Sequence, residues 1–167
     1  DIISFLSSNF FKAQCNQIDT KAKKIVEKEI SNYFNDYKIT LFPYARTSLY
    51  AILKNLNLKE GSKILCTPIN IYPMVNIIEN LGYKVEFVDL NLIDFGPDYK
   101  YLEKKLSERP SCFFLTYLFG YVPNMKLIVE LCTKFNVPII EDISQNIGSS
   151  YNSQLLGTFG KAAIYSA

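Results

Sequence analysis

The chain has 167 residues, 49% of them hydrophobic and 20% charged, which is enough for one globular domain with a buried core. Its 18 basic and 16 acidic residues are spread along the sequence, so no basic stripe indicates a nucleic-acid or anionic-membrane partner. Histidine is absent, which excludes Ser-His and Cys-His catalytic arrangements and His-ligated zinc, so any catalysis needs another base or a cofactor.

The first predicted element is an amphipathic helix over residues 19–35, where apolar residues recur every three or four positions. Asp19 or Thr20 could cap its start. A second helix is predicted over 46–56, and Gly61 then closes a tight loop into a strand at 63–67. This order of helix, loop and strand is the unit that the rest of the chain repeats.

Helices and strands continue to alternate toward the end of the chain. The pattern predicts helices at 73–81, 99–107 and 125–135, and strands at 84–89, 111–117, 137–141 and 162–166. Such alternation implies crossover connections, so we predict an α/β fold, a three-layer sandwich with a mainly parallel sheet. The loop from 144 to 161 is long enough to indicate a functional or structured excursion.

The four cysteines, Cys15, Cys66, Cys112 and Cys132, are widely spaced and form no Cys-x-x-Cys pair, so we predict no metal site. We expect them to be reduced thiols of a cytoplasmic protein. The apolar start of the chain lacks a basic leader and is too short to cross a membrane. Because the first residue is Asp, the chain is compatible with a trimmed fragment.

Polar residues just beyond the strands are the ones to inspect, because ligands of open parallel sheets bind at the carboxyl ends of the strands. Glu141 and Asp142 end an apolar strand and are followed by Ser144, Gln145 and Asn146, which places one or two carboxylates and an amide at that edge. The alternative is a simple turn or helix cap.

Nucleotide-binding fingerprints are missing from the sequence. The segment after the first strand, CTPINIY (66–72), is not the Gly-x-Gly-x-x-Gly motif, and Gly157, Gly160 and Lys161 have the wrong spacing for a Walker loop. The helix start at ARTS (45–48) offers backbone N–H groups and two hydroxyls, a suitable cradle for a phosphate, with an ordinary hydroxyl cap as the alternative.

Read in order, several segments resemble the DegT family of fold-type-I enzymes that depend on pyridoxal phosphate. They are ARTSLYA (45–51), GSKILCTP (61–68), LGYKVEFVD (81–89), YLFG (117–120), PIIEDISQ (138–145) and GTFGKAAIYS (157–166). They are similar to the family's Ser-Gly-Thr helix start and to its GDEVIVP, GAKPVFVD, HLYG, PVIEDAAQ and GSFGDAAIFSF segments. Residues 19–167 would be part of the family's cofactor-binding large domain, after an extension at 1–18.

The resemblance implies pyridoxal 5′-phosphate as cofactor and roles for particular residues. Asp142, the one catalytic candidate, would pair with the pyridine nitrogen and keep it protonated. Gln145 would hydrogen-bond the phenolic oxygen, and Tyr72 would stack on the ring. Ile71 could occupy that place instead, and Tyr72 could simply cover an edge of the core.

The phosphate would be held by the backbone amides of Arg46 and Thr47 and by the hydroxyls of Thr47 and Ser166. Three positions depart from the family pattern: Arg46 stands for a Gly, Tyr117 for a His and Lys161 for an Asp. Arg46 removes backbone freedom but adds a cation that could face the phosphate.

The family's covalent lysine would follow Ser166 by a handful of residues, so we expect it beyond Ala167 and do not assign its role to Lys161. The implied function is conversion of a nucleotide-linked keto sugar to an amino sugar for polysaccharide or glycoside synthesis, with an amino-acid donor and a homodimeric enzyme. Two alternatives stay open: a sugar dehydratase of the same family, and a non-catalytic or truncated relative, so the sequence alone does not decide whether this chain is active.

Overall fold

The computed structural model describes residues 20–166 in two parts, one ending at Phe42 and the other beginning at Pro43. The first part contains helix α2 (Thr20–Tyr33), close to the predicted bounds. Within it, the Lys23 ammonium lies 3.7 Å from the Glu27 carboxylate, and Glu27 also accepts a hydrogen bond of 3.2 Å from the backbone N–H of Leu41. The expected cap Asp19 and the expected extension at 1–18 lie outside the described residues.

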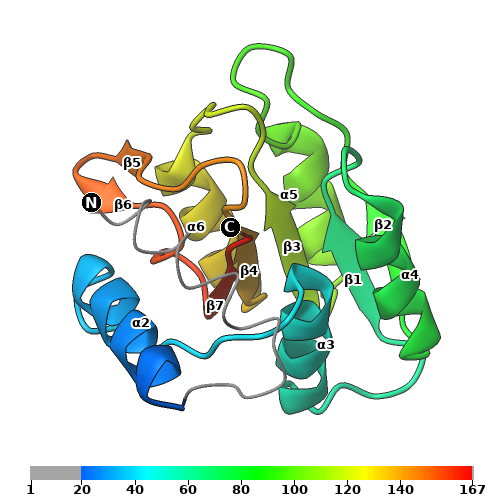
Figure 1. The fold of residues 1–167 in the computed structure, drawn as a ribbon. Coiled ribbons are helices and arrows are strands. Elements are labelled where there is room, and N and C mark those ends of the chain that lie inside the picture. Colours follow the sequence, from blue (N-terminus) through cyan, green and yellow to red (C-terminus); the bar gives the residue numbers. More distant parts are fainter. Residues whose placement is uncertain (1–19, 167) are drawn as a thin grey trace. The chain divides into compact units, whose positions relative to one another are not determined.

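The second part is built on a five-stranded sheet in which every neighbouring pair is parallel (Figure 1). The strand order is β2-β1-β3-β4-β7. The strands are β1 (Lys63–Cys66), β2 (Lys84–Phe87), β3 (Cys112–Thr116), β4 (Ile139–Asp142) and β7 (Ala162–Ile164). The α/β fold with a mainly parallel sheet, predicted from the alternation of elements, is confirmed.

Helices cover both faces of the sheet and make the three layers (Figure 1). Helices α3 and α4 pack together on one face, and α5 and α6 pack together on the other. Their bounds are α3 (Ala45–Asn55), α4 (Tyr72–Asn80), α5 (Tyr99–Ser107) and α6 (Met125–Phe135). The side chain of Asp98 caps α5 by accepting from the Tyr101 N–H at 2.8 Å, and Asn124 caps α6 in the same way.

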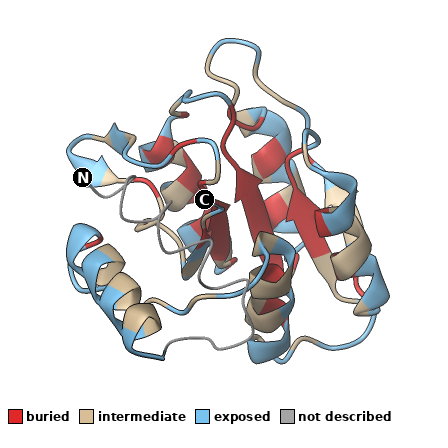
Figure 2. Cartoon of the chain, in the orientation of Figure 1, coloured by how far each residue is buried: buried red, intermediate tan, exposed pale blue. Residues whose placement is uncertain are grey.

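The core lies between these layers, and the central strand β3 is buried along its whole length (Figure 2). On the side of α3 and α4 the sheet contributes alternate residues to one apolar cluster, among them Cys66, Phe114, Ile140 and Ile164. Because side chains alternate along a strand, Thr116 and Asp142 face the same side as Phe114 and Ile140, whereas Glu141 faces α5 and α6.

The three described cysteines, Cys66, Cys112 and Cys132, are buried free thiols, and Cys15 lies outside the described residues. Burial raises the pKa of the Cys112 and Cys132 thiols to about 12. A buried thiol with such a pKa stays protonated and packs as a small apolar side chain.

The loop predicted at 144–161 contains a small antiparallel hairpin of β5 (Ser150–Tyr151) and β6 (Gln154–Leu155). The two residues between the strands, Asn152 and Ser153, have φ of 49° and 66°, as the tight turn of a two-residue hairpin requires. The final strand is shorter than predicted, because the β4–β7 ladder ends at Ile164 and not at Ser166. Across residues 20–166, none of the helices combines the length and apolar character needed to span a membrane.

Candidate functional site

Asp142 is the last residue of β4 and lies at the carboxyl edge of the sheet, on the α3–α4 side. The residue is buried, with a relative exposure of 5%. The Oδ1 atom accepts hydrogen bonds from the backbone N–H of Ser144 at 3.1 Å and from the Ser144 hydroxyl at 2.6 Å. This Asx-type turn fixes the carboxylate at the end of the strand.

The second oxygen of Asp142 is left open to a ligand. Among the described residues, both hydrogen bonds to the Asp142 carboxylate go to Oδ1, and none donates to Oδ2. Burial raises the pKa of the Asp142 carboxyl, while the side-chain and backbone hydrogen bonds from Ser144 act in the opposite direction. A cation placed at Oδ2 would therefore relieve an unfavourable buried charge.

Next to Asp142 lies a pair of polar residues that the sequence did not single out. Thr116 of β3 is the register partner of Asp142, and its hydroxyl accepts a hydrogen bond of 2.8 Å from the side-chain amide of Asn70. The Thr116 N–H donates to the Thr67 hydroxyl at 3.2 Å. The sequence did place Thr67 and Thr116 at the ends of two strands, where ligands of parallel sheets bind. That the two residues meet depends on the strand register, which the sequence does not show.

Glu141 does not join this edge. The sequence left open whether one or two carboxylates would lie there, and the structure places only Asp142, because Glu141 is fully buried on the opposite face. There it accepts a hydrogen bond of 2.6 Å from the hydroxyl of Tyr117, the residue that follows β3. The two adjacent carboxylates thus have separate surroundings.

Gln145 is exposed and connects the residues after β4 to the loop after β3. Its Oε1 accepts a hydrogen bond of 3.1 Å from the Phe119 N–H. The neighbouring Asn146 accepts from the Gly120 N–H at 3.2 Å and donates to the Tyr121 carbonyl at 2.8 Å. With Oε1 engaged, the Gln145 amide nitrogen is the group that can donate to a ligand oxygen.

Helix α3 begins without a side-chain cap. Its N-cap residue is Tyr44, and the Ser48 hydroxyl donates to the Ala45 carbonyl at 2.6 Å instead of capping the first N–H groups. The Arg46 guanidinium lies 3.9 Å from the centre of the Tyr44 ring, a cation–π contact. The hydroxyl cap that the sequence left open as the alternative is therefore absent from the start of α3. A helix start without a cap and with a cation beside it favours binding of an anion.

The topology brings this helix start to the edge where Asp142 lies. Because α3 leads directly into β1, it ends at the amino edge of the sheet and begins at the carboxyl edge (Figure 1). Leu49 and Leu53 of α3 share one core with Ile164 of β7. Ile164 is the register partner of Asp142, so the chain leaves the sheet toward Ser166 at the same edge.

Tyr72 is the first residue of α4 and is 74% exposed, and Ile71 before it is 62% exposed. Both lie at the carboxyl edge, because α4 follows β1. Within the described residues, the side chains of Arg46, Thr47, Tyr72 and Ser166 form no hydrogen bond with those of Asp142 or Gln145. The structure therefore gathers their elements at one edge without linking the side chains directly.

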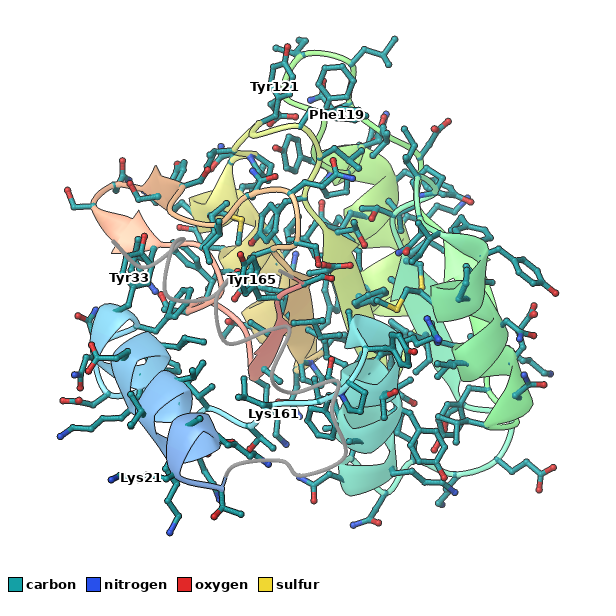
Figure 3. The ribbon with its side chains drawn as sticks, viewed as in Figure 1. Lys21, Tyr33, Phe119, Tyr121, Lys161 and Tyr165 are labelled. Atoms are coloured by element: carbon teal, nitrogen blue, oxygen red, sulfur yellow. The ribbon has the colours of Figure 1, made fainter. Side chains whose placement is uncertain are left out.

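Lys161 lies at the opposite end of β7 from Tyr165, as the labelled side chains in Figure 3 show. Its backbone N–H donates to the Ile139 carbonyl at 2.8 Å, at the start of β4, and its side chain is exposed. Asp142 stands at the other end of β4. Lys161 thus lies beside Ile139, three residues before Asp142 along β4.

These groups fit pyridoxal phosphate. The open oxygen of Asp142 suits a protonated ring nitrogen, the uncapped start of α3 suits a phosphate, and the Gln145 amide suits a ring oxygen. Tyr72, exposed at the start of α4, offers an aromatic face at the same edge of the sheet. The arrangement combines a carboxylate buried in apolar surroundings with a separate helix start that suits a phosphate. A metal ion alone would not require the second feature.

The chain has relatives among known proteins. The chain is 26% identical over 161 residues to GDP-perosamine synthase of Escherichia coli O157:H7, and 29% identical over 160 residues to the UDP-4-amino-4,6-dideoxy-N-acetyl-beta-L-altrosamine transaminase of Campylobacter jejuni (strain 81-176). These matches cover 96% and 93% of this chain but 43% and 42% of the relatives, so the chain spans less than half of their length.

The fold is shared with solved structures as well. The Escherichia coli GDP-4-keto-6-deoxy-D-mannose-3-dehydratase, solved with bound hydrated pyridoxal phosphate, superposes with a TM-score of 0.81 at 18% identity, covering 95% of this chain and 42% of that one. Residues 13–167 match the sequence family described as DegT/DnrJ/EryC1/StrS aminotransferases. The chain therefore belongs to the DegT/DnrJ/EryC1/StrS aminotransferase family, which is pyridoxal-phosphate-dependent.

Proposed function

We propose that this chain is part of an aminotransferase that uses pyridoxal phosphate to convert a nucleotide-linked keto sugar into an amino sugar. The observation that carries the proposal is the buried carboxylate of Asp142, with one oxygen fixed by Ser144 and the other open at the carboxyl edge. The family membership and the names of the two relatives, which refer to GDP- and UDP-linked sugars, support the substrate class.

When bound, pyridoxal phosphate supplies an electron-withdrawing ring that stabilises the negative charge left on the amino-bearing carbon after its proton is removed. Asp142 holds a proton at the ring nitrogen, because an anion in apolar surroundings favours a neighbouring cation. The Gln145 side-chain amide orients the ring by donating to its phenolic oxygen. Tyr72 covers one ring face and limits access of water.

The phosphate is assigned to the start of α3 and to the residues that follow β7. The helix start has no side-chain cap, which leaves the backbone N–H of Arg46 available to a phosphate. The Thr47 N–H donates to the Tyr44 carbonyl at 2.9 Å, so it would have to be shared with or released to the phosphate. The Thr47 and Ser166 hydroxyls add two further donors from separate elements. Arg46 adds positive charge, and its guanidinium lies 3.9 Å from the centre of the Tyr44 ring.

We further propose that residues 19–167 form part of the cofactor-binding domain, that the complete protein is a cytoplasmic homodimer and that its product enters polysaccharide or glycoside synthesis. Apolar side chains exposed at the carboxyl edge, in the loops and at the start of α4, support a partner surface. They are Ile69, Ile71, Tyr72, Phe119 and Tyr121, with exposures between 45% and 74%. An amino acid such as glutamate would serve as the amino donor.

The test is to incubate the complete protein with pyridoxal phosphate, glutamate and GDP- or UDP-linked 4-keto-6-deoxy sugars, and to follow products by mass spectrometry. An amino sugar formed together with 2-oxoglutarate supports the proposal. The E. coli dehydratase shares this fold, so loss of a hydroxyl without amination would assign the second candidate, a sugar dehydratase. No turnover together with no cofactor binding would identify a non-catalytic relative.

A further inference from the structure

Glu141 is a fully buried carboxylate that the proposed chemistry does not use. It accepts four hydrogen bonds: from the Tyr117 hydroxyl at 2.6 Å and from the backbone N–H groups of Gly157, Phe159 and Gly160 at 2.7, 2.8 and 2.6 Å. A buried charge is tolerated only when its oxygens are saturated with donors. Here both oxygens are engaged, and three of the donors come from the turn that leads into β7.

The turn at 157–160 lies directly against β4. A Cβ atom added at Gly160 would lie 2.6 Å from the Ile139 carbonyl oxygen and 3.3 Å from Glu141 Oε1, so only glycine allows this approach. The next residue, Lys161, donates its N–H to the same Ile139 carbonyl. The contacts of Glu141 thus hold the turn where the pairing between β4 and β7 begins.

β7 depends on this support, because it has only three residues and stands at the end of the described sheet. Its register pairs Glu141 with Ala163 and Asp142 with Ile164. A slip of one residue would turn every side chain of the strand to the other face. Ser166, two residues beyond Ile164, would then leave the sheet on the wrong side of Asp142.

Tyr117 completes the arrangement from β3. Its ring is buried, its hydroxyl donates to Glu141, and the Met125 sulfur of α6 lies 3.3 Å from the hydroxyl oxygen. Burial, and next the charge of Glu141, raise the pKa of the Tyr117 hydroxyl well above its ordinary value, so this group remains a proton donor. The Tyr117 hydroxyl thus supplies the one hydrogen bond to Glu141 that does not come from the turn at 157–160.

We propose that Glu141 is a positioning residue for the cofactor site: by holding the turn at 157–160 it sets the register of β7 and so places Ser166 on the Asp142 side of the sheet. This inference rests on the proposed function, because that function assigns Ser166 to the phosphate. The adjacent carboxylates of β4 then have different tasks. Asp142 contacts the ring, and Glu141 acts on the phosphate end through the backbone.

The test uses two ligands without an aldehyde, so that surface lysines cannot capture them: 4-deoxypyridoxine 5′-phosphate and 4-deoxypyridoxine. Their dissociation constants are measured by calorimetry for the wild type, for Glu141→Gln, and for Glu130→Gln, a control that removes an exposed carboxylate of α6. We expect E141Q to weaken binding of the phosphorylated ligand about tenfold, or about 1.4 kcal/mol, with no comparable change for the other ligand. E130Q should bind both as the wild type does.

Two further readouts separate positioning from general loss of stability. Hydrogen exchange in E141Q should accelerate in peptides covering 157–166 and stay unchanged in those covering α5. Tyr117→Phe, which removes the donor, should weaken the phosphorylated ligand, and Tyr117→His, which restores an N–H donor, should recover part of the affinity. Exchange that rises uniformly over the sheet, or equal affinities in the Phe and His variants, would overturn the inference.

The two proposals can fail separately. A wild-type chain that does not prefer the phosphorylated ligand would refute the assignment of the phosphate, and with it the role of Glu141. A wild-type chain that shows the preference, beside an E141Q variant that keeps it unchanged, would refute only the positioning role.

Discussion

Asp142 and Ile164 are partners across the ladder between β4 and β7, and this pairing determines where the chain leaves the sheet. Asp142 ends its strand with a buried carboxylate, and Ile164 ends its strand two residues before Ser166. Both face the cluster that contains the apolar side of α3. The carboxylate proposed to bind the ring and the hydroxyl proposed to bind the phosphate therefore emerge at one edge, although 24 positions separate 142 from 166 in the sequence.

Asp142→Asn is expected to stabilise the ligand-free chain at pH 7 by about 0.5–2 kcal/mol, because it removes a buried charge while Asn can still accept from Ser144. The free energy of unfolding is measured in urea. A variant less stable than the wild type would show that the carboxylate is not strained by burial.

The pH dependence of that difference has a definite sign. In the unfolded chain the pKa of Asp142 is about 3.9. Burial raises this pKa in the folded chain. The folded chain holds this proton more tightly, so the group's contribution to stability declines as pH rises through the unfolded pKa and up to the folded pKa. The advantage of D142N should grow over that window.

Thr116→Val should lower the free energy of unfolding by about 1 kcal/mol, because it leaves the Asn70 amide without the acceptor that now lies 2.8 Å away. Val nearly matches Thr in shape, so the lost hydrogen bond dominates the effect. Urea unfolding measures it, with Thr133→Val on the exposed face of α6 as the control. Equal losses in the two variants would contradict the assigned pairing of Asn70 and Thr116.

Gly160→Ala should destabilise the chain by about 1–3 kcal/mol, because the added Cβ would lie 2.6 Å from the Ile139 carbonyl oxygen and the turn would have to move. Thermal unfolding monitored by circular dichroism provides the measurement. A melting temperature unchanged from that of the wild type would show that the turn at 157–160 is not pressed against β4.

Lys161 should not be a preferred attachment point for pyridoxal phosphate. It lies at the opposite end of β7 from the edge where Asp142 stands (Figure 3). After incubation with the cofactor and reduction with borohydride, peptide mapping should find Lys161 labelled no more than exposed Lys126 of α6. Stoichiometric labelling of Lys161 alone would mean that the candidate site lies at the wrong edge of the sheet.

The sequence predicted the regular elements well where local signals mark their ends. Helices α5 and α6 were predicted with the bounds that the structure shows, because Asp98 and Asn124 cap them and their apolar residues follow the helical period. The hairpin of β5 and β6 was not predicted, because two-residue strands carry no detectable period. The turn Asn152-Ser153 also lacks the glycine that most often marks such hairpins.

The site was predictable only in part, because its composition depends on strand register. Asp142 was predicted as a carboxylate at the end of an apolar strand. Because side chains alternate along a strand, Glu141 points to the opposite face of the sheet. Which of the two carboxylates faces the site is known only from the structure of β4. The Asn70–Thr116 hydrogen bond joins residues 46 positions apart, which no local pattern indicates. The contact of Arg46 with Tyr44 is local, but it depends on the rotamer of a flexible side chain, which the sequence pattern does not indicate.

The central claim is that Asp142 holds the ring nitrogen of the cofactor. Its most direct measurement is the dissociation constant of 4-deoxypyridoxine 5′-phosphate for the wild type and for Asp142→Asn, determined by calorimetry at pH 7. The account predicts binding at least about tenfold weaker in D142N, from loss of a charge-assisted hydrogen bond worth about 1.5–3 kcal/mol, in a variant that is more stable than the wild type. Equal affinity in the two proteins would contradict it.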